Sequence, residues 1–374
     1  MARIKAFLTN LGLLVALSFA TGSLSSLFLA GLDWIQQNGS YLYALPILGL
    51  VFQSIPFPAY LIIPASWLSH LAGASVGREG VAVNMGKVLG EKISALDVFP
   101  KAGMAAGFAS VFGTPLAGAF FALEVGEVGK INFRHIPVCL FAAFSANYVS
   151  LHVYGTKHLS YPSIFLPSFS VTFYAKLALL GLFLALIAFL YKRSESIIFS
   201  AFDKSPVQGP LKGILAGLLL FGVLSIPVFH ETIGLGSEFL LRPFTAAAPD
   251  FALWKMLATN LSLGLGFKGG EATPLFLIGS HAASGFGSWL ALPLGLSAAI
   301  GFVSLYGGLA KTPLAATLLG VELFGPSAWF CYFIITLIVL FGSGKKGIFT
   351  SQTWADYLCK SLRTIRLLPR KPPD

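Results

Sequence analysis

The sequence predicts an all-α integral membrane protein, and two observations support this fold class. The chain of 374 residues is 56% hydrophobic and only 11% charged, with a mean hydropathy of +0.80. That is more apolar surface than a water-soluble core buries. The charges are also segregated, so that uncharged stretches span residues 6–32, 39–76, 102–123, 177–191, 213–230, 272–310 and 323–343. Most of these stretches are long enough to cross a bilayer about 30 Å thick.

Proline and glycine divide the longer apolar stretches, for example at Pro46, Pro56, Pro274 and Pro293. Since one spanning helix needs about 20 residues, we expect roughly ten to fourteen apolar helical pieces of uneven length, some of them broken or re-entrant. Protein must shield their irregular joints, because lipid cannot bind free backbone N–H and C=O groups.

Basic residues gather at both ends of the chain. The excess of +10 charges lies partly at Arg3, Lys5, Lys360, Arg363, Arg366, Arg370 and Lys371. By the positive-inside rule we expect both termini in the cytoplasm. Residues 1–23 also have the pattern of a secretory signal, but many apolar spans follow, so we expect a retained first helix. The basic tail, residues 351–374, is expected beside anionic lipid headgroups, with no nucleic acid partner.

An internal repeat divides the membrane part into two halves. GFASVFGTPLAGAFFALE at residues 107–124 matches GFVSLYGGLAKTPLAATLLGVE at residues 301–322. Both read G-F-x-S-x-aromatic-G, then T-P-L-A, then a glutamate, and the four extra residues of the second copy are expected in the joint before its threonine.

We therefore expect a first membrane repeat at residues 1–160, a connection at 161–170 and a second membrane repeat at 171–350. Transporters built from repeats bind their substrate near the bilayer midplane, where broken helices direct their N-termini at it. Unpaired N–H groups and the positive end of the helix dipole favour an anion there.

A glycine-flanked acid opens an apolar stretch in each half, at Gly77-Arg78-Glu79-Gly80 and at Gly269-Gly270-Glu271-Ala272. Glu79 is the predicted functional residue, since an ionisable group inside a membrane is a functional hypothesis by default. As a carboxylate it can occupy an anion site, and when protonated it leaves, which couples anion movement to proton binding. The alternative is that Glu79 only pairs with Arg78. We expect Gly77, Arg78, Gly80 and Val81 to form the anion site around Glu79.

Neither an enzyme nor a cofactor site is expected. The chain has no phosphate loop, HExxH or CxxC motif. Its three cysteines and six histidines are scattered, which favours packing roles over a metal site.

Three segments, taken together, resemble the CLC chloride channel and transporter family: GREG with the following VAVNMG, AAGFASVFGTPLAGAFFALEV, and GGEATPLFLIG. The resemblance extends over residues 11–352. The stretch GFKGGEATPLF, residues 266–276, is similar to the fluoride/proton antiporter branch, whereas chloride members carry a phenylalanine where Ala272 or Thr273 stands. Chloride relatives also often have a second glutamate at the position of Val125, and its absence agrees with the fluoride branch.

The resemblance implies a CLC-type inverted repeat of tilted and broken transmembrane helices, assembled as a homodimer in a bacterial inner membrane. It implies that Glu79 is the external gating glutamate and that Thr273 places a hydroxyl near the anion. A hydroxyl is a good donor to a small, strongly hydrated anion, although Thr273 can instead bond a helix carbonyl. Glu124 and Glu322 are expected to accept structural hydrogen bonds at helix ends.

Two segments depart from the family. The glycine-rich loop expected upstream of GREG has no counterpart in VFQSIPFPAYLIIPA, residues 51–65. The pathway then lacks one wall, uses Gln53 or Ser54 in its place, or is broken. In GSGKKGIFTSQ, residues 342–352, Phe349 stands where the family places a coordinating tyrosine, and only its ring edge can face an anion.

Three functions remain open. The favoured one is secondary active export of fluoride in exchange for protons at Glu79. The second is a passive chloride or general anion channel on the same scaffold. The third is a degenerate, non-transporting homologue.

Overall fold

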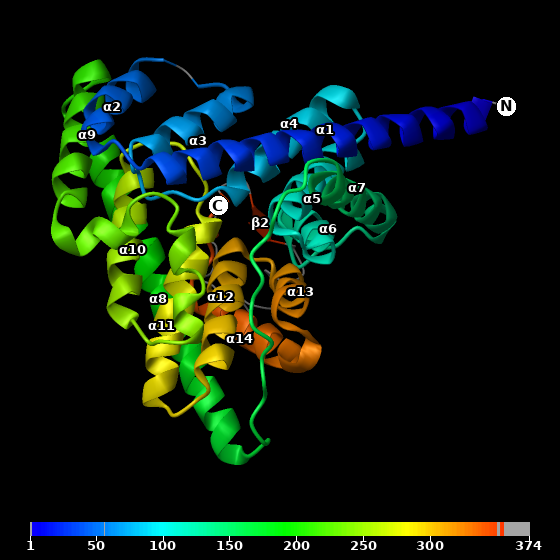
Figure 1. Ribbon diagram of the computed structural model, residues 1–374. Helices are drawn as coiled ribbons and strands as arrows, with labels where there is room; N and C mark the ends of the chain where they lie inside the picture. The colour runs from blue at the N-terminus through cyan, green and yellow to red at the C-terminus, as the bar shows by residue number, and fades with distance from the viewer. Residues whose placement is uncertain (1, 56, 350–351, 355–374) are drawn as a thin grey trace, which may run out of the picture.

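The computed structural model describes residues 2–55, 57–349 and 352–354, and within them the chain forms fourteen α-helices of 10 to 37 residues (Figure 1). The first seven are α1 (Ala2–Asn38), α2 (Leu45–Ser54), α3 (Ile62–Leu71), α4 (Glu79–Ile93), α5 (Val98–Phe112), α6 (Pro115–Glu124) and α7 (Ile136–Tyr148). The second seven are α8 (Val171–Asp203), α9 (Gly209–Leu224), α10 (Pro249–Gly264), α11 (Ala272–Trp289), α12 (Leu294–Ala310), α13 (Pro313–Phe324) and α14 (Trp329–Gly342). The predicted all-α fold with helices of uneven length is confirmed.

Short elements fill the joints between these helices. These short helical elements are η1 (Leu42–Ala44), η2 (Ala59–Leu61), η3 (Phe133–His135), the π-helical η4 (Val149–Val153), η5 (Pro227–Thr232), η6 (Ser237–Phe239), η7 (Arg242–Phe244) and η8 (Pro326–Ala328). Two residues of β1 (Glu127–Val128) pair in parallel with two of β2 (Thr353–Trp354). This ladder ties the end of the described chain to the first half. Of the predicted tail, residues 351–374, only residues 352–354 are described, and the rest lies outside the described residues.

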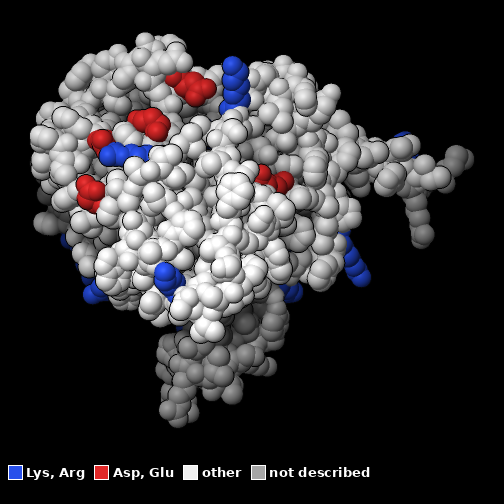
Figure 2. Space-filling view, turned by 60° about the horizontal axis from the view of Figure 1, so that its bottom comes forward, with Lys and Arg blue, Asp and Glu red and all other residues white. Residues whose placement is uncertain are grey.

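Only some of the helices are long enough to cross a membrane on their own. By length and apolar composition, Ile4–Asn38, Phe133–Val153 and Val171–Asp203 can do so. Seven further apolar helices have 10 to 17 residues, so they fall short of the roughly 20 residues that one span needs. Figure 2 shows a face dominated by uncharged side chains, as expected for a surface in contact with lipid.

The two halves use the same local construction. Helices α6 and α13 both begin at the proline of a Thr-Pro step, where proline lacks only an N–H that has no intrahelical partner. The helix before each step ends in a left-handed residue, Gly113 at φ 73° and Lys311 at φ 60°. The four extra residues of the second copy were expected in the joint. They instead lie in the last turn of α12 and its cap, because the helix continues to Ala310.

Glycine pairs bring helix backbones into direct contact in both halves. A Cβ atom at Gly103 would lie 1.9 Å from the carbonyl oxygen of Gly86, and one at Gly301 would lie 2.0 Å from that of Gly279. No side chain fits at either crossing, of α4 with α5 or of α11 with α12. Small residues at such crossings are typical of helix packing in membranes.

A segment without helix or strand, residues 155–170, lies on the connection from α7 to α8. The predicted connection, residues 161–170, lies inside it. Part of this chain covers the candidate site, because His158, Leu159 and Tyr161 line a small gap beside Glu79.

Candidate anion site

The two glycine-acid motifs meet in the structure, although they lie in different halves of the sequence. The N–H of Gly77 donates to the carbonyl of Gly270 over 2.5 Å, and the N–H of Gly270 donates to the carbonyl of Gly77 over 2.7 Å. This antiparallel bridge holds the start of α4 beside the start of α11. The two helix N-termini therefore begin at one point of the molecule.

Glu79 is the centre of this arrangement and is only 1% exposed. One oxygen, Oε1, accepts a hydrogen bond from Nε of Arg78 over 3.3 Å. The other, Oε2, accepts two from Thr273, 2.9 Å from its backbone N–H and 2.5 Å from its hydroxyl. Thr273 is the second residue of α11, so its N–H has no partner within the helix. The carboxylate of Glu79 thus stands at a helix N-terminus, where a free anion binds.

The contacts of Glu79 and Thr273 bear on the two alternatives that the sequence left open. Glu79 does contact Arg78, but its shorter contacts are those to Thr273. The Thr273 hydroxyl donates to this carboxylate and not to a helix carbonyl.

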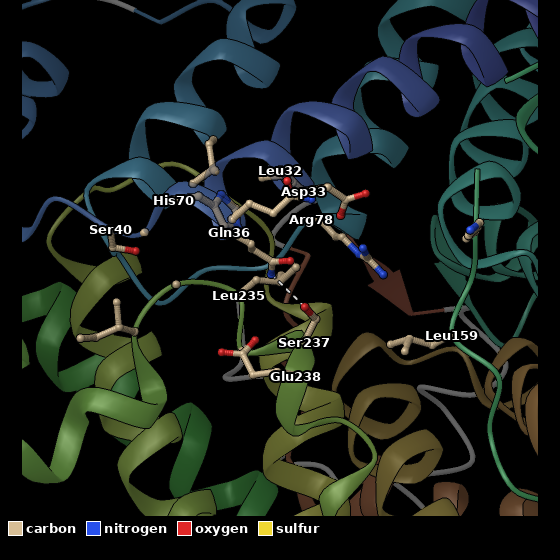
Figure 3. Close-up of a pocket in the computed structure, with 17 residues that line it drawn as sticks. Leu32, Asp33, Gln36, Ser40, His70, Arg78, Leu159, Leu235, Ser237 and Glu238 are labelled. Atoms are coloured by element: carbon tan, nitrogen blue, oxygen red, sulfur yellow. Dashed lines mark hydrogen bonds between the residues drawn. The ribbon is translucent and has the colours of Figure 1, made fainter. Parts of the chain in front are cut away.

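Two cavities approach Glu79. The first, which we call the Arg78 cavity, has a volume of about 560 Å³. Figure 3 shows Arg78, Asp33, His70 and Glu238 around it, with Gln36 of α1 donating to the hydroxyl of Ser237 over 2.8 Å. Its charges are mixed, since Arg78 and Lys157 line it together with Asp33 and Glu238.

The second, the Phe349 cavity, has a volume of about 480 Å³ and is lined by Gly80, Val81 and Phe349 among others. A third gap of only about 20 Å³ is lined by Arg78, Glu79 and Thr273 among others, and it shares Arg78 and Leu159 with the lining of the Arg78 cavity.

The predicted site residues divide between these places. Arg78 lines the Arg78 cavity, while Gly80, Val81 and Phe349 line the Phe349 cavity. Gly77 is not among the residues lining either cavity, and its N–H is taken by Gly270. A Cβ atom there would lie 2.8 Å from Cδ of Pro274, so a glycine is needed for the close approach of the two motifs.

The segment in place of the expected glycine-rich loop contributes one apolar residue. Ile62 at the start of α3 lines the Phe349 cavity, whereas Gln53 and Ser54 line neither cavity. Among the described residues 51–55 and 57–65, no α-helix begins before Ile62. The wall of the cavity at this point is therefore hydrocarbon.

Two polar residues of the Phe349 cavity were left out of the predicted site. Glu271 directly precedes α11, and its carboxylate accepts a hydrogen bond from the hydroxyl of Tyr191 over 3.1 Å. Tyr306 is 2% exposed and packs against Phe276 beside the cavity. The signal for both was in the repeat, because Glu271 mirrors Glu79 and Tyr306 is the aromatic residue of the second copy.

Glu124 and Glu322 accept backbone hydrogen bonds at helix ends, as predicted, but from the opposite half. Glu124 accepts from Leu314 and Ala315 at the start of α13, over 3.1 and 2.7 Å. Glu322 accepts from Leu116 and Ala117 at the start of α6, over 2.9 and 2.8 Å. Helices α6 and α13 lie side by side in Figure 1.

The comparisons with known sequences agree with this geometry. The sequence pattern of the family described as voltage gated chloride channel matches residues 53–342. The chain is 33% identical over 379 residues to a chloride/fluoride channel protein of Pseudomonas syringae pv. tomato, covering 88% of this chain and 83% of that one. It is 27% identical over 290 residues to the H⁺/Cl⁻ exchange transporter ClcA of Vibrio cholerae, covering 67% and 59% of the two chains.

Solved structures give the same result. A CLC-type fluoride/proton antiporter superposes with a TM-score of 0.85 at 26% identity, covering 92% of this chain and 97% of that one. A slow cyanobacterial Cl⁻/H⁺ antiporter superposes with a TM-score of 0.72 at 19% identity, covering 96% and 98%. The second likeness concerns the fold alone.

Proposed function

Because the chain belongs to the voltage-gated chloride channel (CLC) family, we propose that it exports fluoride from a bacterial cell in exchange for protons. Members of this family are anion channels or transporters and not enzymes, so the chain is a multi-pass membrane protein of anion transport. The proposal concerns the ion that is carried and its coupling to protons.

The observation that carries the proposal is the pair of hydrogen bonds from Thr273 to Oε2 of Glu79. Hydrogen bonds to a charged acceptor are roughly twice as strong as neutral ones. Protonation of Glu79 removes this charge and weakens its hold on Thr273. The carboxyl group then leaves, and an anion takes its place at the same N–H and O–H donors.

Fluoride fits these donors better than a larger halide does. A small, strongly hydrated anion gives up its water only to groups that donate short hydrogen bonds, and Thr273 offers a hydroxyl and a backbone N–H side by side. The likeness to a chloride/fluoride channel protein and to the structure of a fluoride/proton antiporter supports the same choice.

The energetics suit export. We propose that the Arg78 cavity faces outward and that both termini lie in the cytoplasm. The exit of a fluoride anion and the entry of a proton are both equivalent to moving positive charge into the cell. Since moving one charge through 100 mV is worth about 2.3 kcal/mol, the membrane potential and the pH gradient act together.

In this proposal the anion passes through both cavities. Arg78 attracts the anion on the outer side, and Gly80, Val81 and Phe349 form its wall on the inner side. Each subunit of a proposed homodimer, built from repeats at residues 1–160 and 171–350, carries one such route.

A passive anion channel is the second candidate, and one observation favours it. Phe349 and Ile62 both line the Phe349 cavity without offering a hydrogen-bond donor. A weakly coordinating inner wall favours rapid, uncoupled passage over tight binding. If this lack of hydrogen-bond donors prevents anions from passing the Phe349 cavity, the chain is a non-transporting homologue.

The test is ion flux from liposomes that contain the purified chain, with fluoride, chloride and protons followed together. We expect fluoride efflux to drive protons uphill, and Glu79→Gln to abolish this coupling. Glu231→Gln is the matched control, because Glu231 is exposed and only pairs with Arg242. Chloride flux without proton movement would establish the channel instead, and flux of neither ion would establish the non-transporting homologue.

A further inference from the structure

We infer that Lys311 is a positioning residue that holds the segment formed by residues 343–349 and 352, and with it Phe349, at the Phe349 cavity. The inference rests on the proposed function in one respect only, that this cavity is the inner part of an anion route. Lys311 itself does not line the cavity, so it acts through the segment that it binds.

The ammonium group of Lys311 lies among hydrogen-bond acceptors. The residue is 1% exposed, and its Nζ lies 2.7 Å from the carbonyl oxygen of Leu340, 2.7 Å from the hydroxyl of Ser343 and 2.7 Å from the carbonyl oxygen of Gly344. A lysine ammonium has three N–H donors, and here each has an oxygen acceptor. Burial of a cation is costly unless such acceptors are present.

These acceptors mark the end of α14 and the chain that leaves it. Leu340 is among the last four residues of α14, whose carbonyl groups have no partner within the helix. A positive charge is stabilising at this end of the helix dipole. The side chain of Lys311 thus caps the C-terminal end of α14, while its backbone forms the C-cap of α12.

The backbone conformation of Lys311 indicates that its side chain is needed. It adopts the left-handed region at φ 60°, and the residue that caps the matching helix of the first half, α5, is Gly113 at φ 73°. Glycine adopts this conformation readily, whereas a residue with a Cβ atom is strained in it. In the second half the strained residue stands at the point from which an ammonium reaches three oxygens of another segment.

Neighbouring residues of α12 hold the same segment at two further points. The N–H of Ile348 donates to the carbonyl of Leu309 over 3.0 Å, and Nε2 of Gln352 donates to the carbonyl of Ala310 over 2.6 Å. Three consecutive residues, 309–311, therefore bind the segment on both sides of Phe349.

Phe349 transmits this anchoring to the cavity. Its ring meets that of Phe121 edge to face, with centroids 5.7 Å apart, and both residues line the Phe349 cavity. Loss of the Lys311 anchor frees the segment at its N-terminal end and lets the ring move. The size and polarity of the cavity wall then change, and with them the discrimination between halides.

The experiment compares Lys311→Met, Lys311→Arg and Ser343→Ala in the full-length chain reconstituted in membranes. The first readout is backbone hydrogen exchange of residues 345–352. We expect exchange about tenfold faster in Lys311→Met, a smaller change in the same direction in Ser343→Ala, and near-native exchange in Lys311→Arg, which keeps a cationic donor. Lys204→Met, at an exposed lysine, is the control and leaves exchange unchanged.

The second readout is the ratio of fluoride to chloride flux, which we expect to fall several-fold in Lys311→Met and to be preserved in Lys311→Arg. A merely structural lysine would lower the midpoint of thermal unfolding while leaving the ratio and the exchange rate unchanged, and that result overturns the inference. If Lys311→Met does not fold, the same comparison is made with Ser343→Ala. If the native chain moves neither ion, the proposed function has failed, and exchange alone decides whether Lys311 anchors the segment.

Discussion

Glu124 and Glu322 exchange roles across the molecule, because each lies in the last turn of a helix of its own half and accepts hydrogen bonds from the first free N–H groups of a helix in the other half. The four hydrogen bonds range from 2.7 to 3.1 Å. Two carboxylates thereby join α6 to α13 without any side chain of the anion site. The link is structural, and it predicts an effect on stability with no effect on ion selectivity.

Glu322→Ala is expected to lower the free energy of unfolding by about 2 kcal/mol, because it removes two charge-assisted hydrogen bonds and leaves two N–H groups at the start of α6 unpaired. Unfolding by denaturant in detergent micelles measures the loss. The fluoride to chloride flux ratio of the surviving protein should match the native ratio, and a change in that ratio would contradict a structural role. In the double variant with Glu124→Ala, a loss that differs from the sum of the single losses would show that the two links act together.

Thr273→Val is expected to reduce proton-coupled fluoride flux by about tenfold or more, since a hydrogen bond to a charged group contributes roughly 1.5–3 kcal/mol. The valine has nearly the same shape but lacks the hydroxyl that donates to Glu79. Flux from liposomes measures the effect, and Thr273→Ser, which keeps the hydroxyl, is the control. Equal losses in both variants would mean that the hydroxyl has no part in transport.

Phe349→Tyr is expected to lower the anion concentration at which flux is half-maximal, because it adds an O–H donor to a ring that lines the Phe349 cavity. The measurement is flux against internal fluoride and chloride concentration. Phe349→Leu keeps the wall apolar and separates the effect of the hydroxyl from that of altered packing. An unchanged half-saturation value in Phe349→Tyr would place the ring away from the anion.

Gly103→Ala is expected to destabilise the protein by about 3 kcal/mol, because the added methyl would lie 1.9 Å from the carbonyl oxygen of Gly86 and overpacking forces backbones apart. The yield of monodisperse protein and its thermal unfolding midpoint measure this loss. Gly12→Ala is the matched control on α1, where a Cβ atom meets no other atom within 4 Å. A Gly103→Ala protein as stable as this control would show that α4 and α5 can separate without cost.

The sequence singled out residues that the structure brings together at the centre of the candidate site, but it did not show how they meet. The two glycine-acid motifs and Thr273 were identified because charge and glycine are rare and informative inside apolar stretches, and the structure places Glu79 against Thr273. The bridge between Gly77 and Gly270 was not predicted, since a repeat shows which residues correspond but not which of them touch.

Other errors have similar physical causes. Glu124 and Glu322 were recognised as helix-end acceptors, but their exchange between halves depends on tertiary packing that no spacing reveals. The four extra residues before Thr312 were placed in a joint, and they instead lengthen α12, which continues to Ala310 and lies against α14 at Gly307 and Gly308. Gln53 and Ser54 were considered as substitutes for the missing loop on polarity alone, and the chain directs Ile62 to that position instead.

The exchange of glutamates between halves also bears on how the chain is made. The N–H group of Leu116 is synthesised 206 residues before the carboxylate that binds it. During translation the start of α6 therefore enters the bilayer without its acceptor, and it obtains one only after α13 has left the ribosome. The first half reaches its final structure late, and its assembly in the membrane depends on the arrival of the second.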